Sequence, residues 1–206
     1  VLLRMVFGLI AGACERFPSI PAMSISVKTL EIPDVMIIEP TVYTDDRGDF
    51  FEGWNEVDFA TATGFSGQFV QDNQSRSRAG VLRGLHYQLP HPQGKLVRVL
   101  AGLAFTVAVD LRRSSPSFGE SVDCELSADN RLQLWVPPGF AHGFLALADP
   151  TDVLYKVTSA FAPDCEREIR WNDPELGIQW PIGDERPSMS DRDRAAPRFA
   201  DAPVYR

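Results

Sequence analysis

The sequence is poor in cysteine, in histidine and in net positive charge, and each shortage excludes a class of protein. Its three cysteines, Cys14, Cys124 and Cys165, form no close pair and no metal-type spacing, so we expect neither a disulfide framework nor a zinc site. Lys and Arg number 20 against 28 Asp and Glu, and the net charge of −8 argues against nucleic acid or an anionic membrane as the main partner. This composition fits a reducing cytoplasm best.

Long apolar runs are also lacking beyond the N-terminus. Residues 1–14 hold one positive charge and a short apolar run, which loosely imitates the apolar region of a signal peptide but is too short to span a bilayer. Patterned sequence begins only at residues 24–35. We therefore expect residues 1–22 to be a non-native or disordered extension upstream of a true start at Met23, with export as the alternative, and residues 23–206 to form a single domain.

Short strands dominate the remaining pattern. From residue 35 onward, apolar or alternating runs are separated by Gly, Pro, Asp and Asn at intervals of roughly ten residues. This rhythm predicts an all-β fold, an antiparallel sandwich or jelly roll, rather than a parallel α/β sheet. Helical patterns are few: residues 55–64 with Asn55 as N-cap, and residues 190–197 with Ser190 as N-cap.

The most informative stretch is residues 81–100, where His86, Arg83 and Lys95 interrupt an otherwise apolar strand pattern. Strict alternation would place Arg83 and His86 on opposite faces, so they share a cavity only if the strand bends, as a bulge at Gly84 would allow. An imidazole beside fixed cations is suited to removing a proton from carbon next to a carbonyl. Alternation along the second strand of this stretch places Lys95 on a face that is otherwise apolar. The alternatives are a core histidine bonded to a neighbour and an edge lysine that reaches solvent.

Other polar residues give weaker signals. Arg47 is predicted in a turn and Glu52 on the strand that follows, where both could be ordinary surface charges. The run at residues 71–75 places several side-chain hydrogen-bonding groups at an apparent strand end. Tyr155 lies on the inward side of an alternating run, and its partners decide whether it is a packed ring or an acid.

A metal site is not expected. A metal-binding cupin needs two histidines at i and i+2 together with a carboxylate, and His86 has no histidine at that spacing. His142 lies between two Gly-bordered phenylalanines, and His91 lies in a predicted loop.

Ten motifs, in this order, carry a resemblance to a known family: DDRGDFFE, QDN, VLRGLHYQLP, GKLVRV, VAVDLR, SPSFG, LWVPPGFAHGF, LYK, WNDPELGIQWP and MSDRDRAAP. Over residues 24–197 the chain resembles the dTDP-4-dehydrorhamnose 3,5-epimerase family, a metal-free cupin-type jelly roll usually found as a homodimer. The resemblance implies cofactor-independent conversion of dTDP-4-dehydro-6-deoxy-D-glucose to dTDP-4-dehydro-L-rhamnose in dTDP-L-rhamnose biosynthesis. Both inverted carbons, C3 and C5, are α to the C4 ketone, so this chemistry needs a base, a group that holds an enolate and an acid on the opposite face.

The resemblance also implies roles for individual residues. His86 matches the family's base, and Asp193 matches the carboxylate that orients it, although a helix-dipole partner is the simpler reading of Asp193. Lys95 matches the group that stabilises the enolate oxygen, and Tyr155 matches the acid. Positions that bind sugar, diphosphate or thymidine in the family are Arg47, Glu52, Gln71, Asp72, Asn73, Arg83, His142, Glu166 and Arg192.

Several positions depart from the family pattern. Leu103 and Thr106 stand where two carboxylates are common, and Ala160 and Phe161 stand where two tyrosines are common. We expect these positions to border the pocket and to affect substrate choice or the balance between C3 and C5. Three alternatives therefore stay open: a C3 or C5 mono-epimerase of a related nucleotide-linked 4-ketosugar, a non-catalytic sugar-nucleotide-binding cupin, and a metal-dependent cupin.

Overall fold

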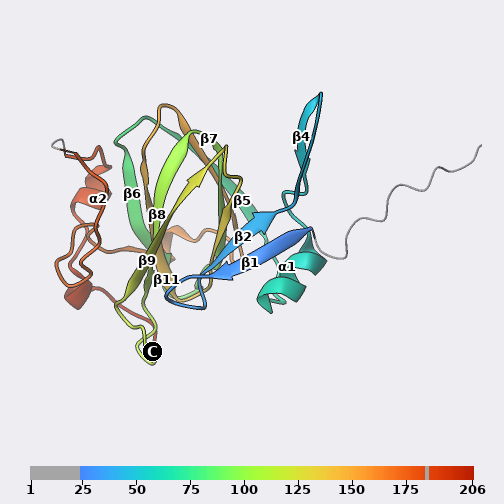
Figure 1. Cartoon of the computed structure of the whole chain (residues 1–206). Coiled ribbons are helices and arrows are strands. Elements are labelled where there is room, and N and C mark those ends of the chain that lie inside the picture. Colours follow the sequence, from blue (N-terminus) through green and yellow to red (C-terminus); the bar gives the residue numbers. More distant parts are fainter. Residues whose placement is uncertain (1–23, 184–185) are drawn as a thin grey trace, which may run out of the picture.

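The computed structural model describes residues 24–183 and 186–206, and the expectations about residues 1–22 and Met23 lie outside these ranges. Two antiparallel sheets pack face to face and a hairpin projects from them (Figure 1). The predicted all-β class is therefore confirmed. No helix among the described residues is both long and apolar enough to cross a membrane.

Two sheets and a separate hairpin account for all the strands of the described chain. The six-stranded sheet has the order β1 (Ile25–Thr29), β2 (Met36–Pro40), β10 (Gln133–Val136), β7 (Lys95–Ala101), β12 (Thr151–Val157) and β5 (Gln71–Ser77). The five-stranded sheet has the order β13 (Glu166–Glu168), β6 (Leu82–Gln88), β11 (Phe140–Ala146), β8 (Leu103–Asp110) and β9 (Ser121–Ser127). The hairpin consists of β3 (Val42–Asp45) and β4 (Gly48–Phe51).

Side chains alternate between the two faces of each sheet, and apolar clusters lie on both faces. Inward residues such as Val97 and Val153 pack against Ala108 and Phe144 of the opposite sheet to form the central core. A second apolar cluster lies on the outer face of the five-stranded sheet, where the C-terminal segment covers it through residues that include Ile169. The C-terminal segment is therefore part of the packed structure.

Both predicted helices are present. The helix α1 (Glu56–Thr63) begins after Asn55, whose Oδ1 accepts hydrogen bonds from the backbone N–H groups of two first-turn residues. Its Phe59 packs on the outer face of the six-stranded sheet. The helix α2 (Asp191–Arg194) begins after Ser190, as predicted, but it is shorter than the predicted segment. Two 3₁₀ turns, η1 (Pro163–Cys165) and η2 (Phe199–Asp201), complete the helical structure of the described residues.

The predicted bend at Gly84 is confirmed. Where β6 pairs with β11, His86 faces His142 and Arg83 faces Phe144, so β6 carries one extra residue in this interval. Gly84 has a φ of +120°, and a Cβ there would lie 2.6 Å from the Cα of Gly143. Glycine at this position thus allows the bulge, and the bulge lets Arg83 and His86 line one cavity.

Candidate active site

A cavity of about 350 Å³ lies between the inner faces of the two sheets. The residues that line it come from both sheets and from the segment after β12: Asn73, Ser75, Arg83, His86, Lys95, His142, Phe144, Tyr155, Phe161 and Glu166. A smaller adjoining cavity of about 80 Å³ shares several of these residues and adds Tyr87, Gln88 and Gln93. Seven of the predicted site residues therefore meet in one place.

The side chain of His86 is held by Asp193 of α2. The His86 Nε2 and Asp193 Oδ1 atoms lie 2.5 Å apart, and the Asp193 side chain is 5% exposed. The Ser190 hydroxyl accepts a hydrogen bond from the Asp193 backbone N–H at 3.0 Å, which fixes the first turn of α2. Burial acts to raise the pKa of Asp193, but the hydrogen bonds from His86 and Ser190 and the Arg192 charge outweigh it, so this pKa lies below its usual range.

Lys95 projects from the start of β7 into the cavity, as the alternation predicted. Its residue is 6% exposed, and its ammonium donates a hydrogen bond to the backbone carbonyl of His86 at 3.1 Å. Burial lowers the pKa of Lys95 to about 8, although the negative charge of Glu166 acts in the opposite direction. Near neutral pH the cavity therefore holds a largely dehydrated cation directly beside His86.

His142 and Tyr155 face the same cavity from opposite sheets. Burial lowers the pKa of His142 well below its usual range, and the nearby Lys95 ammonium lowers it further, so this ring is neutral. Its buried Nε2 has no hydrogen-bond partner within the described part of the chain, which leaves it available to a ligand. Burial and the nearby Glu166 carboxylate raise the pKa of Tyr155, which keeps its phenol protonated.

Glu166 and Arg192 form an ion pair at the rim of the cavity. Arg192 of α2 contacts the carboxylates of both Glu166 and Glu168 on β13. The Arg192 side chain is half-exposed, whereas both carboxylates are largely buried. The predicted residue Arg192 thus lies next to the cavity and is not one of its lining residues.

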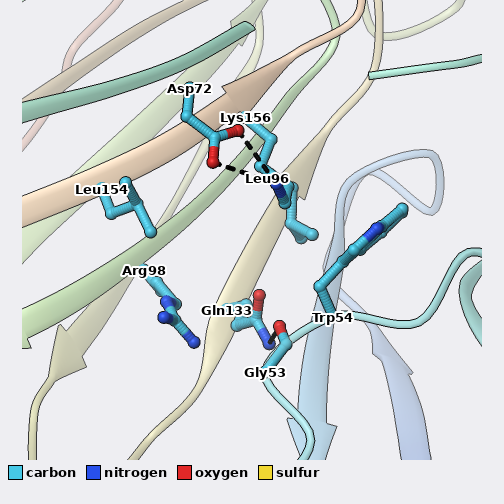
Figure 2. Close-up of a pocket in the computed structure, with 8 residues that line it drawn as sticks. All are labelled: Gly53, Trp54, Asp72, Leu96, Arg98, Gln133, Leu154 and Lys156. Carbon is cyan, nitrogen blue, oxygen red and sulfur yellow. Dashed lines mark hydrogen bonds and ion pairs between the residues drawn. The ribbon is translucent and has the colours of Figure 1, made fainter. Parts of the chain in front are cut away.

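The structure keeps three predicted binding residues away from the cavity of their own chain. Arg47 lies in the turn of the β3–β4 hairpin, where its 90% exposed side chain pairs with Asp45. Glu52 accepts hydrogen bonds from Ser24 and Asn55. Asp72 points to the outer face of the six-stranded sheet and pairs with Lys156 at 2.9 Å (Figure 2).

The residues that depart from the family pattern do not all line the cavity. Phe161 lines it, but Leu103 and Thr106 do not, so the expectation that these two border the pocket was wrong. Both lie on β8, which is separated from β6 by β11, and the Thr106 hydroxyl donates to the carbonyl of Cys124 on β9 at 3.1 Å.

Sequence reasoning missed three further polar residues around the cavities. Ser75 lies two residues after Asn73 on β5, so the inward alternation of that strand could have found it. Gln88 belongs to the VLRGLHYQLP motif and lies two residues after His86 on β6, so the alternation of that strand could have found it, whereas Gln93 lies in the loop before β7 and follows no periodic pattern. Among the described residues, no three His, Cys, Asp or Glu side chains are grouped so that they could hold a metal ion.

A two-sheet β fold with a histidine–carboxylate pair and a buried lysine in its inner cavity defines a class of proteins suited to proton transfer at carbon. Residues 29–201 match the family described as dTDP-4-dehydrorhamnose 3,5-epimerase. The chain belongs to this family. A relative of that name from Pseudomonas aeruginosa is 55% identical over 176 residues, which cover 85% of this chain and 97% of the relative.

Solved structures agree with this assignment. A dTDP-6-deoxy-D-glucose-3,5-epimerase from Legionella pneumophila, in complex with dTDP-4-keto-L-rhamnose, has a TM-score of 0.85 at 44% identity and covers 88% of this chain and 99% of its own. A 3'-monoepimerase from Streptomyces bikiniensis, in complex with dTDP-quinovose, has a TM-score of 0.78 at 34% identity. The match covers 84% of this chain and 87% of the monoepimerase chain. The cupin-type fold is therefore confirmed.

The contact between His86 and Asp193 predicts a pH-dependent contribution to stability. Because the folded-state pKa of Asp193 is lowered, the carboxylate stabilises the fold above its unfolded-state pKa of about 4, and this contribution is lost as pH falls through the folded-state pKa. We expect Asp193→Asn to reduce the free energy of unfolding at neutral pH and the difference from wild type to shrink at acid pH. Urea unfolding of both proteins from neutral to acid pH measures this difference in the free energy of unfolding. A difference that does not change with pH would contradict a stabilising Asp193 carboxylate.

Proposed function

We propose that this protein is a dTDP-4-dehydrorhamnose 3,5-epimerase that acts on dTDP-4-dehydro-6-deoxy-D-glucose in dTDP-L-rhamnose biosynthesis. The observation that carries this proposal is the meeting of His86, Lys95 and Tyr155 in one cavity, with Asp193 behind the histidine. The family relatives support the choice of substrate. A non-catalytic binding protein would have no need to keep this costly set of buried groups.

His86 is the proposed base. With its Nε2–H donated to Asp193, the ring presents Nδ1 as the nitrogen with a free lone pair. This nitrogen removes the proton from C3 or C5, and the electrons move onto the C4 oxygen to form an enolate. Asp193 stabilises the positive charge that develops on the imidazole and holds the ring in one orientation.

Lys95 and Tyr155 complete the proposed proton transfer. The Lys95 ammonium pairs with the charge that grows on the C4 oxygen, and its dehydration makes this interaction stronger than it would be in water. Tyr155 then returns a proton to the carbon from the face opposite His86, which inverts the centre. A raised pKa suits the phenol to this role because it is protonated at neutral pH.

The other predicted residues around the cavity are proposed to bind the nucleotide sugar. Arg83 provides a cation suited to a diphosphate, and the free Nε2 of His142 and the amide of Asn73 provide neutral hydrogen-bonding groups. Glu166 lines the cavity from β13, and Arg192 of α2 pairs with it beside the cavity. No step of this mechanism needs a cofactor.

A C3 or C5 mono-epimerase is the second candidate, because one structural neighbour is a 3'-monoepimerase. Two observations make it the weaker candidate. The relative from Pseudomonas aeruginosa is markedly more similar in sequence. The departures at Leu103 and Thr106 do not touch the cavity and give no reason for a changed reaction.

We further propose that the protein acts as a homodimer in the cytoplasm, with the β3–β4 hairpin of one chain reaching the cavity of the other. Arg47 and Glu52 match family binding positions but lie away from their own cavity, and the hairpin projects from the sandwich (Figure 1). We place the dimer contact on the outer face of the six-stranded sheet, because the buried Nε of Arg98 on this face has no hydrogen-bond partner within the described chain (Figure 2). Leu100 on the same strand is 40% exposed.

Deuterium exchange tests the proposed reaction directly. In D₂O the wild-type protein should introduce deuterium at both C3 and C5 of dTDP-4-dehydro-6-deoxy-D-glucose, as followed by NMR. His86→Ala should slow both exchanges by about 10²- to 10⁴-fold, because a positioned base is lost. His91→Asn is the matched control, since the His91 side chain lies outside both cavities and asparagine tolerates its positive φ. Exchange at one carbon would identify a mono-epimerase, and none would contradict the proposal.

The pKa of Lys95 predicts the alkaline limb of the reaction. The protonated ammonium is the active form, so kcat/KM should fall as pH rises through about 8. Tyr155 does not account for this limb because its pKa lies above its usual range. Lys95→Arg should lower turnover but remove the limb, because arginine stays charged throughout. An unchanged limb in this variant would show that another group titrates.

Mixed dimers test the placement of Arg47. In a dimer of Arg47→Ala with His86→Ala, one cavity would have both His86 and a partner's Arg47. Equal coexpression should therefore restore about a quarter of wild-type activity, because random pairing makes half the dimers mixed and each has one intact site. The two parent variants, assayed separately below KM, are the controls. Activity equal to their average would mean that Arg47 does not serve the partner's cavity.

A further inference from the structure

The β3–β4 hairpin packs on little of its own chain. Tyr43 and Phe50, which pair across its two strands, are 46% and 72% exposed. In the described part of the chain, no residue of β3 or β4 belongs to an apolar cluster. An isolated two-stranded hairpin is at best marginally stable in water. A fixed direction for the projecting hairpin therefore needs another contact (Figure 1).

Arg131 supplies that contact. Its guanidinium pairs with the Asp49 carboxylate on β4. Among the described residues, this is the only side-chain hydrogen bond or ion pair that joins the hairpin to the rest of the protein. The other oxygen of Asp49 accepts a hydrogen bond from the Thr44 hydroxyl on β3 at 2.6 Å. One carboxylate thus links both strands of the hairpin to the loop between β9 and β10.

The loop that carries Arg131 is held by a single side chain. Asn130 Oδ1 accepts hydrogen bonds from the backbone N–H groups of Ser127 at 3.0 Å and Leu132 at 3.1 Å. The Asn130 amide also donates to the backbone carbonyl of Glu125 at 3.0 Å. These three contacts fix the backbone on both sides of Arg131, so its side chain starts from a defined position.

The backbone of Arg131 is in the left-handed region, with a φ of +55°. Residues other than glycine seldom adopt a positive φ, and conformations of this kind cluster at functional sites. The Arg131 guanidinium also donates to the backbone carbonyl of Asp129 at 2.9 Å, which helps to aim it. The side chains of Arg131 and Asp49 are 29% and 30% exposed, so their attraction is screened less than that of a fully solvated pair.

We propose that the ion pair between Arg131 and Asp49 is a brace that sets the direction of the hairpin and so presents Arg47 to the cavity of the partner chain. The inference rests on the proposed dimer for the placement of Arg47. Arg47 lies in the hairpin turn, two residues before Asp49, so fixing Asp49 limits where Arg47 can reach. Arg131 is a positioning residue, because it acts through the hairpin. A hairpin already held in place removes an entropic cost from ligand binding.

The brace predicts weaker binding with nearly unchanged chemistry. Arg131→Gln should raise KM and the Kd for dTDP about fivefold, with kcat within about twofold of wild type, because the proton-transfer groups are untouched. Arg131→Lys retains the charge and should keep both increases below about twofold. Arg113→Gln is the matched control. It removes an exposed arginine that lies over the Phe118 ring, outside the hairpin and both cavities, and should leave both constants unchanged.

Double-mutant cycles separate this role from a general effect on the fold. Asp49→Asn should match Arg131→Gln, and the two together should be no worse than either, since both break one ion pair. If Arg131 acts through Arg47, adding Arg131→Gln to Arg47→Ala should change KM and the dTDP Kd by less than about twofold further. Additive effects in either cycle, a fall in kcat at constant KM, or unchanged constants in Arg131→Gln would overturn the brace.

Mixed dimers test whether the brace serves the partner chain. When Arg131→Gln and His86→Ala are coexpressed equally, each mixed dimer has one cavity that combines His86 with a braced hairpin from the other chain. With a fivefold loss in the Arg131→Gln parent, activity measured below KM should exceed the average of the two parents by about a fifth of the wild-type value. Activity equal to that average would mean that Arg131 serves the cavity of its own chain, which would overturn the proposal.

Failure of the proposed function would give separate results. If mixed dimers of Arg47→Ala and His86→Ala gain no activity, the dimer placement is wrong, and the cycle with Arg47→Ala still shows whether Arg131 positions Arg47. If the wild-type protein gives no deuterium exchange, the proposed reaction is wrong, and the dTDP Kd values still test the brace.

Discussion

The contact between His86 and Asp193 is the interaction on which the site depends, and it ties the C-terminal segment to the five-stranded sheet. It joins β6 to α2 across a sequence separation of 107 residues and is largely shielded from water. Ser190 fixes the helical turn that presents the carboxylate, and the chain on either side of that turn packs on the outer face of the five-stranded sheet. The tail thus serves two purposes at once, since it covers apolar surface and supplies the carboxylate that orients the proposed base.

Dehydration determines the electrostatics of the cavity. Burial lowers the pKa values of Lys95 and His142 and raises that of Tyr155, which leaves one cation, one neutral imidazole and one protonated phenol around a single space. Keeping Lys95 charged there costs stability, and the carbonyl of His86 and the charge of Glu166 offset part of that cost. The dehydrated Lys95 ammonium can therefore interact strongly with any negative charge that develops on a ligand oxygen.

Much of this arrangement could be predicted from the sequence, and the limits have physical reasons. Alternation correctly placed Lys95 and Tyr155 inside, and Gly84 marked the bulge that joins Arg83 to His86, because these features are local. Pairing between distant strands is not local, so the sequence did not show that Leu103 and Thr106 lie away from the cavity. Gln93 was missed because an isolated glutamine in a loop follows no periodic pattern, whereas Gln88 continues the alternation of His86 on β6 and could have been found.

The tautomer of His86 tests the central claim most directly. In ¹⁵N-histidine-labelled protein, long-range ¹H–¹⁵N correlation spectra distinguish the protonated from the unprotonated nitrogen of a neutral ring, and the spectrum of His86→Ala assigns the signals. The proposed mechanism predicts a proton on Nε2, which contacts Asp193, and a bare Nδ1 that is free to act as the base. A proton on Nδ1 in the free protein would contradict the claim that Asp193 prepares His86 for proton abstraction.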